Sequence, residues 1–213
     1  MRNFYKIGEG VNVAPLLFEL QRQPELWDKN PARLSPLGPH FDSHDIFLRY
    51  KDDTSCYSDV SKWKSFSDEH IPNWYKSFDY LPSSRKLIFD LMSFLQGEML
   101  GGVFIYKVEP GHKIHPHEDH GWHPEFFDKF NICLQSNPEA AFQYDNESMF
   151  QRAGDVHYFR NDIRHSVVNE GSCDHIVMTV CIRLDRGFRS QWSPEGWTLE
   201  GQVKGEKSCQ QLG

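Results

Sequence analysis

Two different spacings of hydrophobic residues divide the chain into two halves. In the first half, apolar side chains recur about every 3.6 positions in the segments 13–28 and 84–97, which predicts two amphipathic helices. A proline interrupts the first of these segments, so we expect a break there. Ser83 or Ser84 is expected to cap the second helix, and Gly97 is expected to end it.

Beyond the second helix, apolar and polar residues alternate in short segments that are separated by turn-forming pairs such as Pro-Gly and Asn-Pro. A period of two predicts β-strands. Many short strands at roughly 8–12-residue spacing are typical of a β-sandwich or a jelly-roll barrel. The expected strands are 45–50, 101–109, 129–135, 140–145, 148–152, 155–160, 164–169 and 175–184.

The pattern contains no internal repeat and no low-complexity tract, so we expect one mainly-β domain over residues 1–213. Residues 1–100 would form a helical and loop support, with coil at 29–44 and 51–83. Residues 101–185 would form the jelly-roll core, and residues 186–213 a polar tail.

Composition narrows the function classes. The 213 residues include 30 acidic and 23 basic side chains, a formal net charge of −7, which argues against a protein that coats nucleic-acid phosphates. No apolar run approaches the roughly 20 residues that a membrane span needs, and the N-terminus lacks the apolar core of a signal peptide. Five widely spaced cysteines without a CxxC pair indicate reduced thiols. We therefore expect a cytoplasmic protein with no nucleic-acid or membrane partner.

A cluster of histidines carries the candidate chemistry. Within it, His117 and Asp119 form an H-x-D pair, and residues i and i+2 of an extended segment point to the same side. His165, which lies 46 residues beyond Asp119 at the head of a predicted strand, would complete a set of two histidines and one carboxylate. Such a set leaves metal positions open and is typical of non-haem Fe(II) oxygenases. His115 shares a face with His117 and is therefore the main competing candidate for a metal ligand. The alternative to a metal site is that these histidines are solvated surface residues without a ligand.

The stretch from about residue 85 to 185 resembles the aspartyl/asparaginyl β-hydroxylase family, whose broader grouping includes free-proline hydroxylases. The resemblance rests on Pro110-Gly, Pro116-His117, the segment 154–161, the segment 165–169 and the last strand. It implies a cupin-like double-stranded β-helix, also called a jelly roll, that uses Fe(II), O₂ and the cosubstrate 2-oxoglutarate. It also implies metal ligands at His117 and His165, with Asp119 restoring a carboxylate that some members lack.

One position departs from the family pattern. Members usually carry an arginine ten residues after the distal histidine, where it pairs with the outer carboxylate of 2-oxoglutarate, but here that position is His175. An imidazole offers fewer donors than a guanidinium and needs a proton to carry charge. Either His175 binds the cosubstrate when protonated, or Lys129 replaces it, or 2-oxoglutarate is not used efficiently. The resemblance also implies cosubstrate contacts from Asn131 and Ser166.

These features predict an Fe(II)/2-oxoglutarate-dependent hydroxylase of an amino acid or of a peptidyl Asp, Asn or Pro residue. Arg49 is a candidate for binding a substrate carboxylate, and Trp122 is a candidate for lining the substrate pocket. Two alternatives stay open: a cupin-type metal enzyme that does not use 2-oxoglutarate, and a non-enzymatic jelly-roll binding module. The substrate is a small molecule or a peptide, and the oligomeric state is not defined by the sequence.

Overall fold

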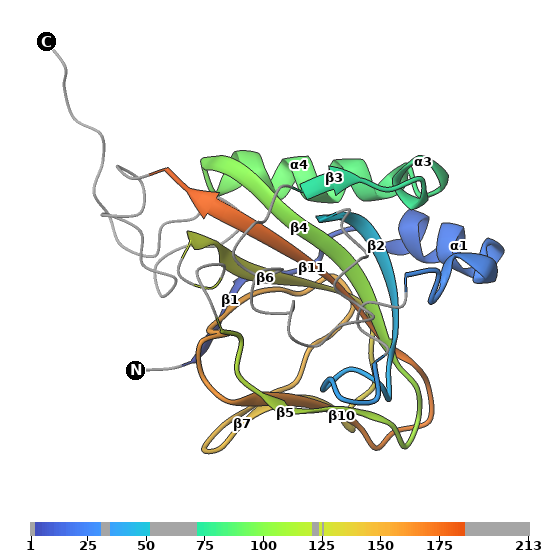
Figure 1. The fold of residues 1–213 in the computed structure, drawn as a ribbon, viewed down its shortest axis with the longest axis vertical. Coiled ribbons are helices and arrows are strands. Elements are labelled where there is room, and N and C mark those ends of the chain that lie inside the picture. The colour runs from blue at the N-terminus through green and yellow to red at the C-terminus, as the bar shows by residue number, and fades with distance from the viewer. Residues whose placement is uncertain (1–2, 31–34, 52–71, 121–123, 125, 186–213) are drawn as a thin grey trace, which may run out of the picture.

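Two antiparallel sheets face each other in the computed structural model, which describes residues 3–30, 35–51, 72–120, 124 and 126–185 (Figure 1). The larger sheet contains, in spatial order, β1 Phe4–Gly8, β9 Val156–Phe159, β6 Asp128–Gln135, β11 His175–Leu184, β4 Gly97–Val108, β2 His44–Lys51 and β3 Pro72–Trp74. The smaller sheet contains β5 Lys113–His117, β10 His165–Asn169, β7 Ala140–Tyr144 and β8 Ser148–Met149. This arrangement confirms the predicted mainly-β jelly roll.

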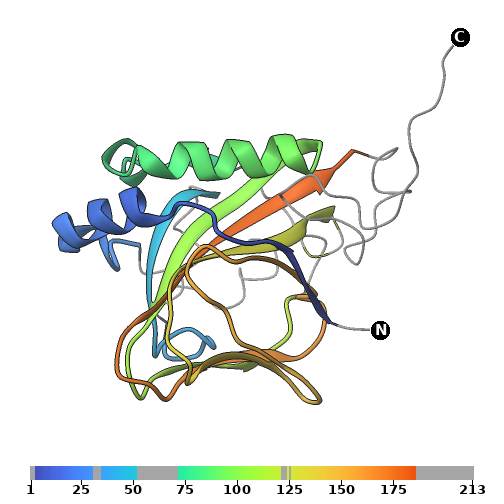
Figure 2. The same ribbon diagram turned by 180° about the vertical axis from the view of Figure 1, so that it is seen from behind.

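The larger sheet has a different hydrophobic layer on each face. Along β11, Ile176, Met178 and Val180 belong to a buried cluster that includes residues of the helices, whereas Val177 belongs to a cluster shared with the smaller sheet. Successive strand residues point to opposite faces, so odd-numbered residues of β11 line the space between the sheets. Figures 1 and 2 show the helices on the outer face of the larger sheet, opposite the smaller sheet.

The two predicted helices are present. Helix α1 covers Ala14–Arg22 and ends before Pro24, where the 3₁₀ helix η1, Pro24–Leu26, begins. Helix α4 covers Ser83–Phe94. Leu16 and Leu20 of α1 and Leu87 and Leu91 of α4 are buried, which explains the 3.6-residue period.

The predicted caps of α4 were wrong. Pro82 occupies the N-cap position, and the side chain of Glu19 from α1 accepts hydrogen bonds from the backbone N–H of Ser83 at 3.0 Å and from its hydroxyl at 2.5 Å. At the other end Gln96 takes the left-handed conformation, with φ of 49°, and Gly97 already begins β4. A tertiary contact therefore supplies the acceptor that a local serine was expected to supply.

Several short elements were not predicted. β1 pairs with β9 along the edge of the larger sheet, and β3 and helix α3, Ser77–Tyr80, lie in a segment expected to be loop. β8 is shorter than the predicted strand 148–152. Elements of two to five residues carry too little periodicity to be recognised from one sequence. Residues 52–71 of the predicted loop lie outside the described residues.

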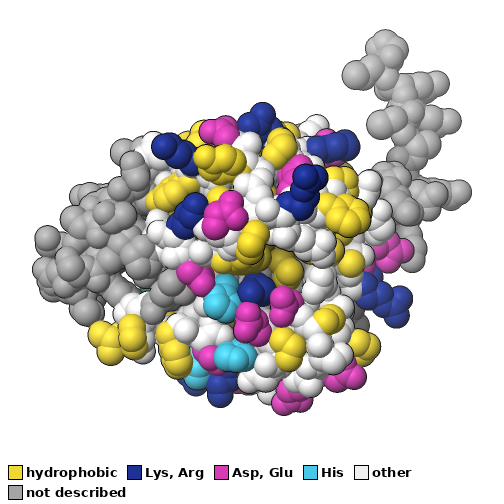
Figure 3. All heavy atoms as spheres, turned by 90° about the vertical axis from the view of Figure 1, so that its right-hand side faces the viewer, with side chains coloured by type: hydrophobic (Ala, Val, Ile, Leu, Met, Phe, Trp, Pro, Cys, Tyr) yellow, Lys and Arg dark blue, Asp and Glu magenta, His cyan; other side chains and the backbone are white. Residues whose placement is uncertain are grey.

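Exposed charges in the described part of the chain often belong to ion pairs, such as Lys86–Asp90 and Arg85–Asp79. Figure 3 shows basic and acidic side chains interspersed over one face of the molecule. Among the described residues no helix is both long and apolar enough to cross a membrane.

We predict that Gly154→Ala destabilises the protein by about 3 kcal/mol, because Gly154 has φ of 86° and an added Cβ would lie 2.7 Å from the carbonyl oxygen of Val11. Gly111→Ala is the matched control. Gly111 has φ of 82°, but no atom lies within 4 Å of its added Cβ, so only the backbone strain of about 1 kcal/mol is expected. Urea unfolding of both variants measures the difference, and equal losses would remove the close contact as the cause.

Candidate metal centre

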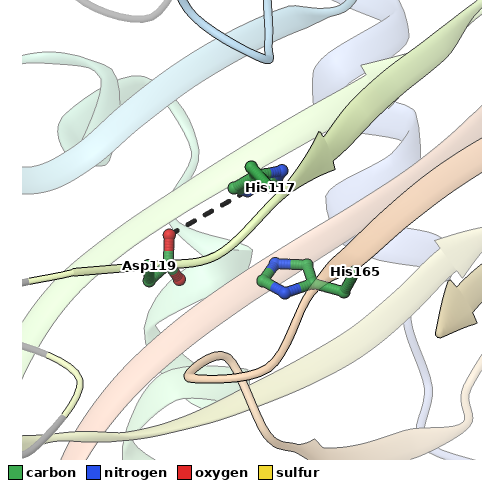
Figure 4. Close-up of side chains that lie close together, drawn as sticks. All are labelled: His117, Asp119 and His165. Atoms are coloured by element: carbon green, nitrogen blue, oxygen red, sulfur yellow. Dashed lines mark ion pairs between the residues drawn. The ribbon is translucent and has the colours of Figure 1, made fainter. Parts of the chain in front are cut away.

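Three side chains meet at one end of the smaller sheet, where β5 ends and β10 begins. His117 is the last residue of β5 and His165 the first residue of β10, and the two are paired neighbours in the antiparallel register. Asp119 follows two residues after His117. One ligand atom from each residue lies within 4.8 Å of the others, and Nε2 of His117 is 3.9 Å from Oδ1 of Asp119 (Figure 4). The structure thus brings together the three residues that the sequence proposed as metal ligands.

Both imidazoles are oriented by backbone carbonyls. Nδ1 of His117 donates to the carbonyl of His115 at 2.8 Å, and Nδ1 of His165 donates to that of Ile163 at 2.7 Å. A proton held on Nδ1 leaves the lone pair of Nε2 free for a metal ion. Burial lowers the pKa of His117 to about 4 and also lowers that of His165, so both rings are neutral near pH 7.

The carboxylate of Asp119 is held in its ionised form. Burial alone would raise the pKa of this carboxyl group, but the Lys129 ammonium beside it holds that pKa well below the usual range. Nζ of Lys129 donates to Oδ2 at 2.5 Å, and Nδ2 of Asn161 donates to the same oxygen at 3.0 Å. Lys129 therefore contacts the proposed metal ligand itself.

Aromatic rings enclose the cluster. The ring of Phe142 stacks on His165 with centroids 5.3 Å apart, and Phe159 meets the same imidazole edge-on at 6.0 Å. The ring of His40 packs edge-on against His117 at 4.9 Å. His40 and Asn161 were not among the site residues predicted from the sequence. His40 lies in a segment expected to be coil, whereas Asn161 lies within the family-like segment 154–161 and could have been considered there.

Two other histidines of this segment, His115 and His120, lie apart from the metal centre. The ring of His115 stacks on Phe41 at 4.6 Å, and the side chain of His120 is 79% exposed. Neither belongs to the group of potential ligands among the described residues. Trp122, the candidate pocket residue, lies outside the described part of the chain.

Two of the proposed cosubstrate residues face the space between the sheets. Asn131 of β6 is fully buried, and its Oδ1 accepts a hydrogen bond of 2.7 Å from the hydroxyl of Thr179. His175 of β11 is 1% exposed, and its Nδ1 lies 2.9 Å from the hydroxyl of Ser136. Nδ2 of Asn131 and Nε2 of His175 have no hydrogen-bond partner among the described residues. Burial lowers the pKa of His175 to about 4, so the unliganded protein has a neutral ring there.

Two further candidates do not join the centre. Ser166 follows His165 in β10 and therefore points to the opposite face of the strand, away from the space between the sheets. The guanidinium of Arg49 donates to the carbonyl of Pro72 at 2.5 Å and lies over the ring of Trp74. The cosubstrate contact expected from Ser166 stays a prediction, and Arg49 is engaged at the β2–β3 edge.

The residues present fit an iron ion. Two Nε2 lone pairs and one carboxylate oxygen converge from neighbouring positions, which is the donor set of the facial Fe(II) triad. The fit to 2-oxoglutarate is partial, because the buried donors Asn131 and His175 are present but His175 is uncharged.

Solved structures that match this chain include a viral collagen prolyl hydroxylase from Paramecium bursaria Chlorella virus-1. It is 10% identical, with a TM-score of 0.48 over 86% of this chain and 97% of that one. A 2OG-Fe(II) oxygenase family oxidoreductase from Burkholderia pseudomallei is 11% identical, with a TM-score of 0.47 over 66% of each chain. A predicted oxalate decarboxylase from Thermotoga maritima is 22% identical, with a TM-score of 0.33 over 40% of this chain and 68% of that one.

No curated protein matches this sequence. The family model described as aspartyl/asparaginyl beta-hydroxylase matches residues 37–183, which is more than half of the chain and includes all three residues of the candidate metal centre. The chain therefore belongs to the aspartyl/asparaginyl β-hydroxylase family.

Proposed function

We propose that this chain is a non-haem Fe(II)/2-oxoglutarate-dependent hydroxylase whose iron is held by His117, Asp119 and His165. The observation that carries the proposal is the convergence of these three donors in a chain of this family. The carbonyls that accept from both Nδ1 atoms support it, because they prepare both Nε2 atoms to bind a metal.

When bound, iron, 2-oxoglutarate and O₂ would supply the oxidation of a substrate C–H bond, with succinate and CO₂ as coproducts. The protein's own residues hold and shield the reactants. His117 and His165 are fixed by backbone carbonyls, Asp119 is fixed by two side chains, and the rings of Phe142 and Phe159 cover His165. These packed rings limit the access of water to the metal centre.

The buried donors between the sheets suit the cosubstrate. A hydroxyl proton donated from Ser136 to Nδ1 of His175 leaves the imidazole proton on Nε2, and that N–H has no partner among the described residues. Nδ2 of Asn131 offers a second buried donor. We propose that these neutral donors, rather than an arginine, meet the carboxylate oxygens of 2-oxoglutarate, since Lys129 is paired with Asp119.

The family supports an aspartyl or asparaginyl residue as the substrate. A free amino acid and a prolyl residue stay open as alternatives. One observation favours a second candidate, a cupin-type metal enzyme that does not use 2-oxoglutarate. His175 is neutral at the position where a fixed positive charge is expected, and a buried carboxylate without a cation is costly.

The experiment that separates the two candidates is a product assay on the full chain. Protein loaded with Fe(II) under argon is mixed with 2-oxoglutarate and O₂, and succinate is measured with and without mixtures of aspartyl, asparaginyl and prolyl peptides and free amino acids. We expect iron-dependent succinate that rises with an accepted substrate. O₂ consumption without succinate would favour the cupin-type enzyme, and a chain that binds neither iron nor another divalent transition metal would reject both.

A further inference from the structure

The two oxygens of the Asp119 carboxylate have different surroundings. Oδ2 accepts hydrogen bonds from Nζ of Lys129 at 2.5 Å and from Nδ2 of Asn161 at 3.0 Å. Oδ1 faces Nε2 of His117 at 3.9 Å (Figure 4). One oxygen thus lies near the imidazole of His117, while the other accepts hydrogen bonds from two protein donors.

Each of these donors is held by the fold. Lys129 belongs to β6 of the larger sheet, where it pairs with Cys181 on one side and Phe159 on the other, and its side chain is only 13% exposed. Asn161 is 4% exposed, and its carbonyl accepts a hydrogen bond of 3.0 Å from the backbone N–H of Asp119. Asp119 is therefore fixed through both its backbone and its side chain.

We propose that Lys129 and Asn161 keep Oδ2 of Asp119 away from the metal, so that this residue provides one oxygen only. The inference rests on the proposed metal site. A carboxylate can bind a metal through one or both oxygens, and a second bound oxygen would fill a position that the facial triad leaves open. Lys129 is then a positioning residue that preserves the positions needed by the cosubstrate and O₂.

Because Lys129 is positively charged, its replacement is expected to tighten metal binding rather than weaken it. An ammonium group near a divalent cation repels it, so replacing Lys129 with methionine removes a repulsion. The same change frees Oδ2 to bind the metal. Both effects tighten metal binding, whereas the cosubstrate loses one of its positions. If Lys129 only stabilised the local structure, its loss would loosen the site and weaken metal binding.

The test uses Co(II), which fills such sites and has a visible absorption spectrum that reports its ligands. Wild-type protein, Lys129→Met and Lys129→Arg are titrated with Co(II), and 2-oxoglutarate is then added. We expect Lys129→Met to bind Co(II) about tenfold more tightly, with a shifted spectrum and a reduced response to 2-oxoglutarate. Lys129→Arg keeps the charge and should remain close to wild type. Circular dichroism checks folding, and Lys129→Gln, which is neutral but polar, replaces Lys129→Met if that variant does not fold.

Weaker Co(II) binding by the neutral variants, or an unchanged spectrum, would overturn the role of Lys129 and leave the metal site in place. A wild-type chain that binds no Co(II), or a His165→Ala variant that binds it as tightly as wild type, would instead overturn the proposed site and this inference together. Asn161→Ala, which removes a neutral donor, should shift the spectrum in the same direction as Lys129→Met but by less.

Discussion

Replacing His165 with alanine is expected to weaken Mn(II) or Fe(II) binding at least about 100-fold, because the variant loses one of three donors. His165 is 6% exposed and its Nε2 is directed by the carbonyl of Ile163, so water cannot replace it with the same geometry. Calorimetric titration of the metal-free protein with Mn(II) measures the loss. His117→Ala should behave in the same way.

The matched control is His115→Ala. This variant removes a neighbouring histidine that packs on Phe41 and is not one of the three proposed metal ligands. Its affinity for the metal should stay within about threefold of wild type. A metal present at 100 times its dissociation constant stabilises the folded chain by about 2.7 kcal/mol. Thermal unfolding with and without Mn(II) is therefore a second measure of metal affinity. One metal per chain in both His117→Ala and His165→Ala would place the site elsewhere.

The second large effect concerns His175 and acid stability. Burial lowers its pKa to about 4 in the folded protein, whereas an unfolded histidine titrates near 6.5. Between these values the unfolded chain binds more protons than the folded chain, so the free energy of unfolding falls as the pH drops from 6.5 to 4. The contribution of His175 to the free energy of unfolding is fully present above pH 6.5. Its complete loss in acid lowers that free energy by on the order of 3 kcal/mol.

His175→Leu should remove this contribution. The variant loses the contact with Ser136, but its unfolding free energy should fall less steeply than that of wild type between pH 6.5 and 4. Urea unfolding at several pH values measures the slope. His120→Leu is the control, because that imidazole is 79% exposed and hydrated in both states. Parallel curves for wild type and His175→Leu would show that His175 does not carry the acid sensitivity.

The sequence was sufficient for those parts of the site that depend on local geometry. His117 and Asp119 could be paired because two residues of an extended segment share a face, and His165 could be added because a strand begins there. The jelly roll followed from the same alternation. The opposite orientations of His165 and Ser166 also follow from this alternation.

Other contacts depend on how distant segments meet and could not be predicted from one chain. Lys129 reaches Asp119 only because β6 lies in the sheet opposite β5. Glu19 replaces the expected serine cap of α4 because α1 packs beside it. The neutral state of His175 follows from its complete burial, and a sequence shows the ordinary pKa of a residue but not its burial.

The three proposed metal ligands come from distant parts of the chain, and this has a consequence for the order of folding. His117 and Asp119 lie 48 and 46 residues before His165, whereas Lys129, which holds Asp119, lies only 10 residues after it. Contacts between residues far apart in the sequence form slowly, because the loops between them must close first. The three metal ligands therefore come together late in folding. A metal ion that is present before then can bind only to individual histidines and carboxylates.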